Sequence, residues 1–263
     1  MPVLYESFGS FITGKPSYRS FFSKRSRGVI TLNEKTLSFE SEVDKIVFHI
    51  KLSEIQDFLM RFRFYIPYIE LNTVNEVTYT LYPLRKHKNS YNSSLVMTAD
   101  LFRELTRLIC NKNQAIFFDA IGIYYPGSFQ NIDFKEYSFK GHIFLTENYI
   151  LFKSFQMGDI NNIKIVDIKQ VIIEIVDSTR YVAVETLEGN IFSFLILKEK
   201  RRKFVKDTIK TEKFYDVLNN TKIYKDSEKL LETRKEKEDV KCLFCGNAID
   251  PEEEICPYCG NKI

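Results

Sequence analysis

The chain has 263 residues, of which 44% are hydrophobic and 28% charged, so it can bury more than one core and is not disordered in bulk. Its 38 basic and 35 acidic residues leave a net charge of only +3, which excludes a strong overall attraction to nucleic acid. No apolar run approaches the about 18 residues that cross a bilayer, and the N-terminus lacks a signal-peptide pattern. We therefore expect a cytoplasmic protein without a transmembrane segment.

The first half of the chain is predicted to form antiparallel strands, which the 23 Phe and 15 Tyr residues also favour. Residues 27–41, RGVITLNEKTLSFES, alternate apolar and polar positions on both sides of a polar turn, as in a β-hairpin. Alternating runs over 45–58 and 68–82 predict further strands. After an insertion over 83–94, we expect an amphipathic helix with Thr98 as its N-cap. Its predicted apolar face consists of Leu101, Leu105, Leu108 and Ile109.

The second half of the chain repeats this pattern. Residues 140–154, KGHIFLTENYILFKS, match residues 27–41 position for position, and alternating runs over 162–175 and 181–197 follow. Residues 198–218 have helical periodicity, and one side of that predicted helix carries Phe204, Val205, Thr208, Ile209, Phe214, Val217 and Leu218. A repeat of roughly 113 residues predicts a duplicated small domain, in which a bent sheet is covered by its C-terminal helix.

The end of the chain carries four cysteines with metal-ligand spacing. Cys242, Cys245, Cys256 and Cys259 form two C-x2-C pairs, and Gly246 or Gly260 follows each pair, where it allows a tight turn. Four thiolates without a place for water predict one structural Zn²⁺ ion, and the segment resembles short zinc ribbons. Two disulfides or four unrelated thiols are the alternatives.

A charged segment separates the repeat from these cysteines. It contains no Pro or Gly and has nearly balanced charge, which predicts a helical tether. The predicted division of the chain is a first domain over 1–112, a second domain over 113–220, a tether over 221–241 and a zinc ribbon over 242–263.

The repeated pattern resembles the pleckstrin-homology (PH) superfamily, and its GRAM-like branch in particular. The positions that carry the resemblance are Gly28, Leu32, Leu37, Phe39 and Ile55 in the first half, and Gly141, Leu145, Thr146, Phe152, Ser154, Ile168 and Gly189 in the second half. The resemblance implies a mainly β fold with two PH-like, partly open antiparallel barrels. Each barrel would be capped by its C-terminal helix, and the zinc ribbon would follow.

Basic clusters supply the candidate binding residues. The resemblance implies that basic loop residues at the open end of a barrel can bind phosphorylated headgroups, and anionic membranes attract such clusters. Solvated surface charge is the alternative. The candidates for lipid or partner binding are Lys24, Arg25, Arg27, Arg85, Lys86, Lys88, Arg201 and Arg202.

The chain shows little sign of catalytic chemistry. Its three histidines are scattered, and it has no catalytic or phosphate-loop motif, so we expect no enzyme. We expect instead an adaptor that binds an anionic membrane surface or a membrane-associated protein, as a cytoplasmic protein that can lie peripherally at the membrane.

The predicted ribbon offers a second interaction site. Phe244 and Tyr258 are candidate anchors for a protein partner, whereas packing around the metal is the alternative role. The ribbon is acidic, which makes nucleic acid an unlikely partner. Two alternative functions stay open: a purely protein-binding scaffold, for example one that recognises a ubiquitin-like partner, and nucleic-acid binding.

Overall fold

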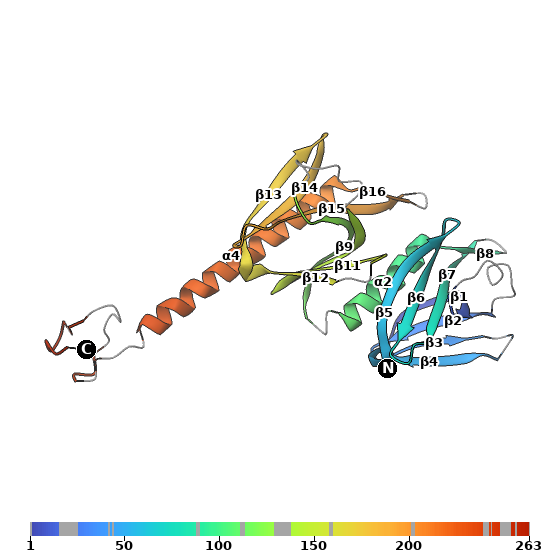
Figure 1. The fold of residues 1–263 in the computed structure, drawn as a ribbon, viewed down its shortest axis with the longest axis horizontal. Helices are drawn as coiled ribbons and strands as arrows, with labels where there is room; N and C mark the ends of the chain where they lie inside the picture. Colours follow the sequence, from blue (N-terminus) through green and yellow to red (C-terminus); the bar gives the residue numbers. More distant parts are fainter. Residues whose placement is uncertain are drawn as a thin grey trace.

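The computed structural model describes residues 2–15, 26–41, 43, 45–87, 90–110, 114–128, 138–157, 160–200, 203–238, 242, 244–247, 254–255 and 257–262. These residues form two eight-stranded antiparallel sheets, and a long helix packs against each sheet (Figure 1). The fold is therefore mainly β, as the sequence predicted, and the sheets curl into half-barrels.

The first sheet is formed by the N-terminal half of the chain. Its strands are β1 (Val3–Thr13), β2 (Ser26–Asn33), β3 (Thr36–Glu40), β4 (Val47–Lys51), β5 (Ile55–Arg63), β6 (Ile66–Thr73), β7 (Thr78–His87) and β8 (Ser90–Ser93). Their order is β4-β3-β2-β1-β7-β6-β5, and β8 pairs with β7. A 3-10 helix, η1 (Leu52–Glu54), links β4 to β5. Helix α2 (Leu95–Ile109) follows β8 and packs against β1, β5, β6 and β7.

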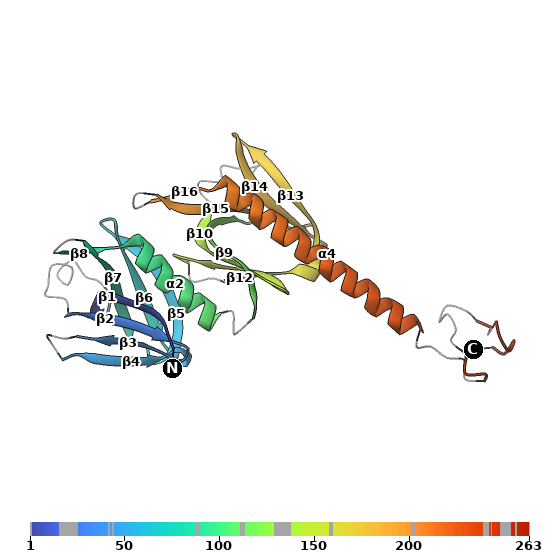
Figure 2. The same ribbon diagram turned by 180° about the vertical axis from the view of Figure 1, so that it is seen from behind.

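The second sheet repeats this arrangement. Its strands are β9 (Ile116–Tyr125), β10 (Phe139–Thr146), β11 (Tyr149–Ser154), β12 (Ile160–Lys164), β13 (Ile168–Val176), β14 (Thr179–Thr186), β15 (Ile191–Lys200) and β16 (Lys203–Lys206). Their order is β12-β11-β10-β9-β15-β14-β13, and β16 pairs with β15. The 3-10 helix η2 (Ile165–Asp167) corresponds to η1. Helix α4 (Thr208–Glu238) packs against β13, β14 and β15, which Figure 2 shows from behind.

Two parts of this shared topology differ from the sequence-based expectation. Strands β1 and β9 precede the matched hairpins and lie in the middle of their sheets, so the repeat is longer than its most similar segments. Residues 83–94 are no insertion, because they contain the end of β7 and all of β8, and the β15–β16 hairpin is their counterpart in the second sheet. The two copies therefore have the same set of strands.

Paired glycines occupy equivalent positions in the two sheets. Gly9 of β1 lies opposite Gly28 of β2, and Gly122 of β9 lies opposite Gly141 of β10. A Cβ atom on Gly28 would lie 1.9 Å from the backbone oxygen of Glu40, and one on Gly141 would lie 2.2 Å from the backbone oxygen of Lys153. At these two positions only glycine allows the neighbouring backbone to approach so closely.

Helix α2 begins earlier than predicted. Ser94 is its N-cap, because the Ser94 side chain accepts a hydrogen bond from the backbone N–H of Met97. Thr98 lies inside the helix, where its hydroxyl donates to the Ser94 carbonyl, so its prediction as the N-cap was wrong. The helix buries Leu95, Ala99, Leu101, Phe102 and Leu105 in the first core, and Leu108 and Ile109 pack against that core.

Helix α4 begins later than predicted. Residues 198–200 end β15 and residues 203–206 form β16, so the helical periodicity was misleading before Asp207. Asp207 precedes the first turn, and its carboxylate accepts a hydrogen bond from the backbone N–H of Lys210. The helix then continues without a break to Glu238.

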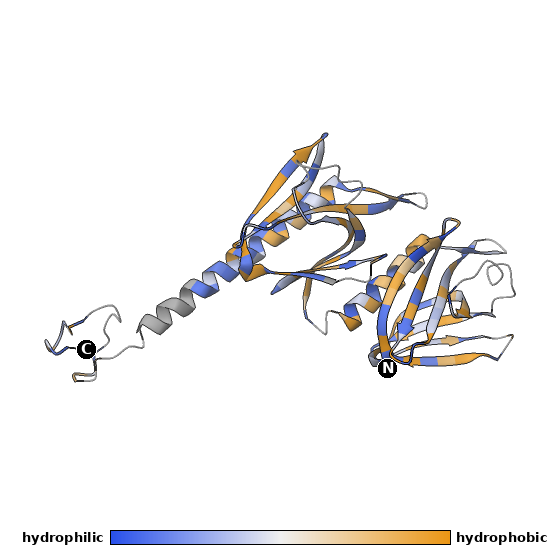
Figure 3. Cartoon of the chain, viewed as in Figure 1, coloured by the Kyte–Doolittle hydropathy of each residue, from blue (hydrophilic) through white to orange (hydrophobic). Residues whose placement is uncertain are grey.

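The buried face of α4 is narrower than predicted. Phe214 and Leu218 are fully buried in the second core, whereas Ile209 is exposed. Phe204 belongs to β16 and packs outside the core that α4 covers. In Figure 3 the strands of both sheets carry hydrophobic residues, and the stretch of α4 that leaves the second sheet is hydrophilic.

The two halves of the chain pack directly against each other. Phe155, which follows β11, belongs to the hydrophobic core of the first sheet and makes an edge-to-face contact with Phe102 of α2 at 5.0 Å. The backbone N–H of Met60 in β5 donates to the Phe155 carbonyl at 2.7 Å. Beside this contact, the Lys153 ammonium lies 2.8 Å from the Asp57 carboxylate. The second half thus supplies both apolar and charged groups to the outer strand of the first sheet.

Candidate metal centre and surface sites

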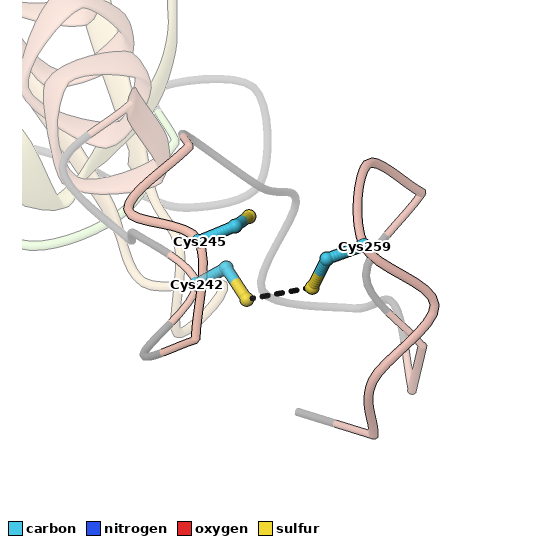
Figure 4. A group of neighbouring side chains, drawn as sticks. All are labelled: Cys242, Cys245 and Cys259. Carbon is cyan, nitrogen blue, oxygen red and sulfur yellow. Dashed lines mark hydrogen bonds between the residues drawn. The ribbon is translucent and has the colours of Figure 1, made fainter.

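Three cysteines come together near the end of the chain. The sulfur atoms of Cys242, Cys245 and Cys259 all lie within 4.8 Å of one another, and Figure 4 shows Cys242 and Cys259 pointing toward each other with Cys245 beside them. The sulfurs of Cys242 and Cys259 are 3.6 Å apart. Thiolates bound to one tetrahedral zinc at about 2.3 Å would lie about 3.8 Å apart, so this spacing fits a shared metal ion.

Tight turns hold these cysteines in position. The backbone N–H of Gly246 donates to the Cys242 carbonyl, and the N–H of Cys242 donates to the Asn247 carbonyl, each at 2.8 Å. Gly246 and Gly260 have φ values of 73° and 71°, a conformation in which a residue with a side chain is strained. This is the role the sequence predicted for the two glycines.

The donor set is suited to a thiophilic metal. None of the described cysteines is in a disulfide, and the Asn261 amide lies 3.5 Å from the Cys259 sulfur, where it can support a thiolate. Cys256, the fourth predicted ligand, lies outside the described residues. Three neighbouring cysteines can thus bind a metal ion, and the structure does not identify which ion.

The structure describes only part of the predicted basic surface. Arg27 is exposed at the start of β2 and lies opposite Ser10, whereas Arg85 and Lys86 are exposed on β7 and lie opposite residues of β8. Other candidates lie outside the described residues: Lys24, Arg25, Lys88, Arg201 and Arg202.

Strand register places Arg27 near the middle of the first sheet. It lies opposite Ser10 of β1, which in turn lies opposite Tyr82 of β7, three residues before Arg85. Arg27 and the basic residues at the end of β7 are therefore only a few residues apart in register.

The predicted aromatic anchors near the metal centre are accessible. Phe244 and Tyr258 are each 67% exposed, and each lies inside one of the two C-x2-C pairs. Ile255, which pairs with Lys262 in a short antiparallel bridge, is exposed as well. These three side chains are accessible at the surface.

A buried contact between His142 and Asp119 in the second sheet lies next to Arg103 of α2. His142 of β10 is almost fully buried, and its Nε2 atom lies 3.0 Å from the Asp119 carboxylate on β9. Burial, assisted by the positive charges of Arg103 and Lys210, lowers the pKa of His142 to about 3. Burial raises the pKa of Asp119 to about 6, although Arg103 opposes the shift from 3.7 Å away. At neutral pH this site therefore holds a neutral imidazole beside a carboxylate.

One exposed feature was missed at the sequence level. Residues 61–65, Arg-Phe-Arg-Phe-Tyr, form the end of β5 and its turn into β6, and their three aromatic rings are exposed. The sequence contained a signal, because the turn between two alternating runs has Phe64 and Tyr65 where Asn, Asp or Gly is usual.

Comparisons with known proteins identify no family for this chain. No protein-family model matches it, and no curated protein matches it. Among solved structures, it is similar to the crystal structure of the C-terminal domain of an unknown protein from Leishmania infantum. The sequences are 12% identical, the TM-score is 0.33, and the match covers 47% of this chain and 95% of that chain. Among the described residues, neither helix has both the length and the apolar character that a membrane-spanning helix requires.

Proposed function

We propose that this protein is a non-enzymatic adaptor, with two PH-like, GRAM-like domains that bind an anionic membrane surface and a structural zinc site that presents a protein-binding surface. The curled antiparallel sheets, each followed by a helix that packs on it, support the PH-like interpretation. The three-cysteine cluster and the two knuckle glycines support the zinc site.

The observation that carries this proposal is the reach of helix α4. An ion pair joins its Lys225 to Glu147 of the second sheet, and the helix continues for another 13 residues to Glu238. At about 1.5 Å per residue, this extension is about 20 Å long. Figure 1 shows the cysteine segment beyond the end of α4 and away from both sheets. An adaptor needs such a separation, because its two partners must bind without colliding.

The proposed membrane binding rests on exposed basic residues. Arg27, Arg85 and Lys86 are exposed on the first sheet, and each basic residue near an anionic leaflet contributes about 1 kcal/mol of attraction. Sedimentation with vesicles tests this membrane binding. Vesicles of phosphatidylcholine alone are compared with vesicles that also contain phosphatidylserine, each at low and at physiological salt concentration. We expect binding only to the anionic vesicles, and weaker binding at the higher salt concentration.

Vesicle binding separates the main alternatives. If the intact protein sediments with neither type of vesicle, the proposed membrane binding is wrong and the protein-binding scaffold becomes the better proposal. Phe244 and Tyr258 would then be the first residues to test against candidate protein partners. Salt-dependent retention of single-stranded nucleic acid without vesicle binding would favour the nucleic-acid alternative.

Metal analysis tests the proposed zinc site. We expect about one zinc ion per chain, lost in Cys242→Ser and Cys259→Ser, because a closed thiolate site needs all of its ligands. Cys110→Ser is the matched control, since Cys110 packs beside the first core and far along the chain from the cluster. Equal zinc content in all three variants would contradict the assignment of the ligands.

A further inference from the structure

The turn between β5 and β6 projects three aromatic side chains into solvent. We call residues 61–65 the aromatic hairpin. Phe62, Phe64 and Tyr65 are 45%, 61% and 98% exposed. Large rings are ordinarily buried, and a contiguous exposed group of them marks an interaction site.

The backbone of the aromatic hairpin makes this composition more unusual. Phe64 and Tyr65 have φ values of 47° and 63°, which bulky residues rarely adopt. The equivalent turn of the second sheet, between β13 and β14, contains Asp177 and Ser178 with φ values of 48° and 59°. Both copies thus use the same turn, and only the first copy fills it with aromatic residues. Neither folding nor solubility requires those rings, because the second copy forms the turn without them.

Two arginines are part of the aromatic hairpin. The Arg61 guanidinium lies 3.5 Å from the buried Glu70 carboxylate, which anchors that side chain to β6. The Arg63 guanidinium lies 5.9 Å from the centre of the Phe64 ring. Basic and aromatic side chains therefore alternate along the end of β5.

A second hairpin adds charge at the same end of the first sheet. Strand β7 runs antiparallel to β6, so the end of β7 lies at the end of the sheet where β5 turns into β6, as Figure 1 shows. Arg85 and Lys86 are exposed near this end of β7. Together with Arg63 they place three cations at the same end of the sheet as the aromatic rings.

We propose that the aromatic hairpin enters the headgroup layer of an anionic membrane while Arg63, Arg85 and Lys86 contact lipid phosphates. This inference rests on the proposed membrane function and names the surface that performs it. It selects the end of the first sheet where β5 turns into β6, and it leaves out Arg27, which is level with Tyr82 in the middle of β7.

The shape of the hairpin favours a lipid surface over a folded partner. A single protruding turn offers no groove, so its partner must supply a cavity, and a headgroup layer opens around an inserted side chain. Tyrosine and phenylalanine flanked by arginine have the amphipathic character of residues at membrane interfaces, where rings lie among the headgroups and cations reach the phosphates.

Tryptophan fluorescence can locate the membrane contact, because the chain contains no tryptophan. Phe64→Trp places a single reporter in the aromatic hairpin, and Asp177→Trp places a matched reporter in the equivalent turn of the second sheet. With vesicles of phosphatidylcholine and phosphatidylserine, we expect a blue shift and quenching by brominated lipid for Phe64→Trp only. Equal responses from both reporters, or a response of Phe64→Trp to single-stranded RNA and not to vesicles, would overturn the proposal.

Exchange of the turn sequence provides an independent test. The double variant Phe64→Asp/Tyr65→Ser copies the turn of the second sheet and should fold normally. We expect about tenfold weaker binding to anionic vesicles for this variant, and a similar loss for Arg85→Ala/Lys86→Ala. Lys140→Ala is the control that should bind like the unmodified protein, because Lys140 is exposed at the equivalent position of the second sheet.

The outcomes distinguish this proposal from the function on which it rests. If the unmodified protein binds anionic vesicles and the turn exchange leaves binding unchanged, the aromatic hairpin is not the contact surface, although the membrane function stands. A loss of binding in Arg27→Ala, with normal binding by the turn exchange, would place the contact around Arg27 instead. If the unmodified protein does not bind, both proposals are wrong.

Discussion

The outer strands β5 and β13 occupy equivalent positions in the two sheets but have different surroundings. In β5, the outward N–H of Met60 bonds to Phe155, whose ring enters the first core. In β13, Ile173 has the equivalent position, and no strand within the described residues pairs with its outer side. A duplicated fold thus repeats its backbone, and a few side chains at edges and turns decide what each copy contacts.

The largest expected effect comes from the residue that makes the two edges different. Phe155→Ala should destabilise the first sheet by about 3–5 kcal/mol, because it leaves a cavity in a core that Phe102 shares. Met157→Ala is the matched control, since Met157 lies in the same turn and is exposed. Chemical unfolding measures both variants, and equal stability would show that Phe155 is not part of the first core.

The ion pair at the same edge should have a smaller effect. The Lys153 side chain is only 2% exposed, and its ammonium lies 2.8 Å from Asp57 and 4.9 Å from the centre of the Phe58 ring. Lys153→Met should cost about 2 kcal/mol, less than for a fully buried pair, because Asp57 is partly exposed and can be hydrated.

A double-mutant cycle isolates the contribution of that ion pair. In the Asp57→Asn background, Lys153→Met should cost less than in the unmodified protein, since the carboxylate is already absent. The same cost in both backgrounds would mean that Lys153 stabilises the interface through packing alone.

The sequence predicted the repeated sheets well because alternating residues and turn residues are local signals. It did not predict the packing between the halves, since Phe155 follows a strand pattern and nothing near it in the sequence indicates a partner about 50 residues earlier. Helix α4 was placed too early because Phe204 and Val205 of the short strand β16 fit the helical period of the residues that follow. The cysteine spacing, by contrast, predicted a cluster, since metal ligation imposes a short and regular pattern.

The third expected effect concerns the two equivalent turns, and it is a smaller effect that stabilises the protein. Left-handed backbone conformations cost about 1–2 kcal/mol per bulky residue, and Asn and Gly suit a turn of this type. Phe64→Asn/Tyr65→Gly should therefore stabilise the protein by about 1–2 kcal/mol while it weakens vesicle binding. Asp177→Asn/Ser178→Gly should change stability less, because Asp already tolerates this conformation. If the first exchange destabilises the protein, the aromatic rings have a structural role.

The last expected effect is small in the unmodified protein, because the two buried groups of the His142–Asp119 contact change stability in opposite directions as the pH falls. Burial, with Arg103 and Lys210 nearby, lowers the His142 pKa to about 3, so the folded protein binds fewer protons here than the unfolded chain. The stability that a neutral His142 allows is therefore present above about pH 6.5 and is lost as the pH falls toward 3. Asp119 behaves oppositely, because its raised pKa of about 6 relieves its burial cost as the pH falls below 6.

The opposite signs of these two contributions make the pH prediction specific. Between pH 7 and 4, Asp119→Asn should lose more stability than the unmodified protein, because Asp119 no longer offsets the destabilisation that comes from His142. His142→Gln should lose less stability over the same range, since only the stabilising effect of Asp119 remains. Urea midpoints at several pH values measure both differences, and effects common to all three proteins cancel. Parallel pH profiles would show that Asp119 and His142 do not have these shifted pKa values. Profiles of the two variants that diverge from the unmodified protein in opposite directions require both groups to be buried together beside α2.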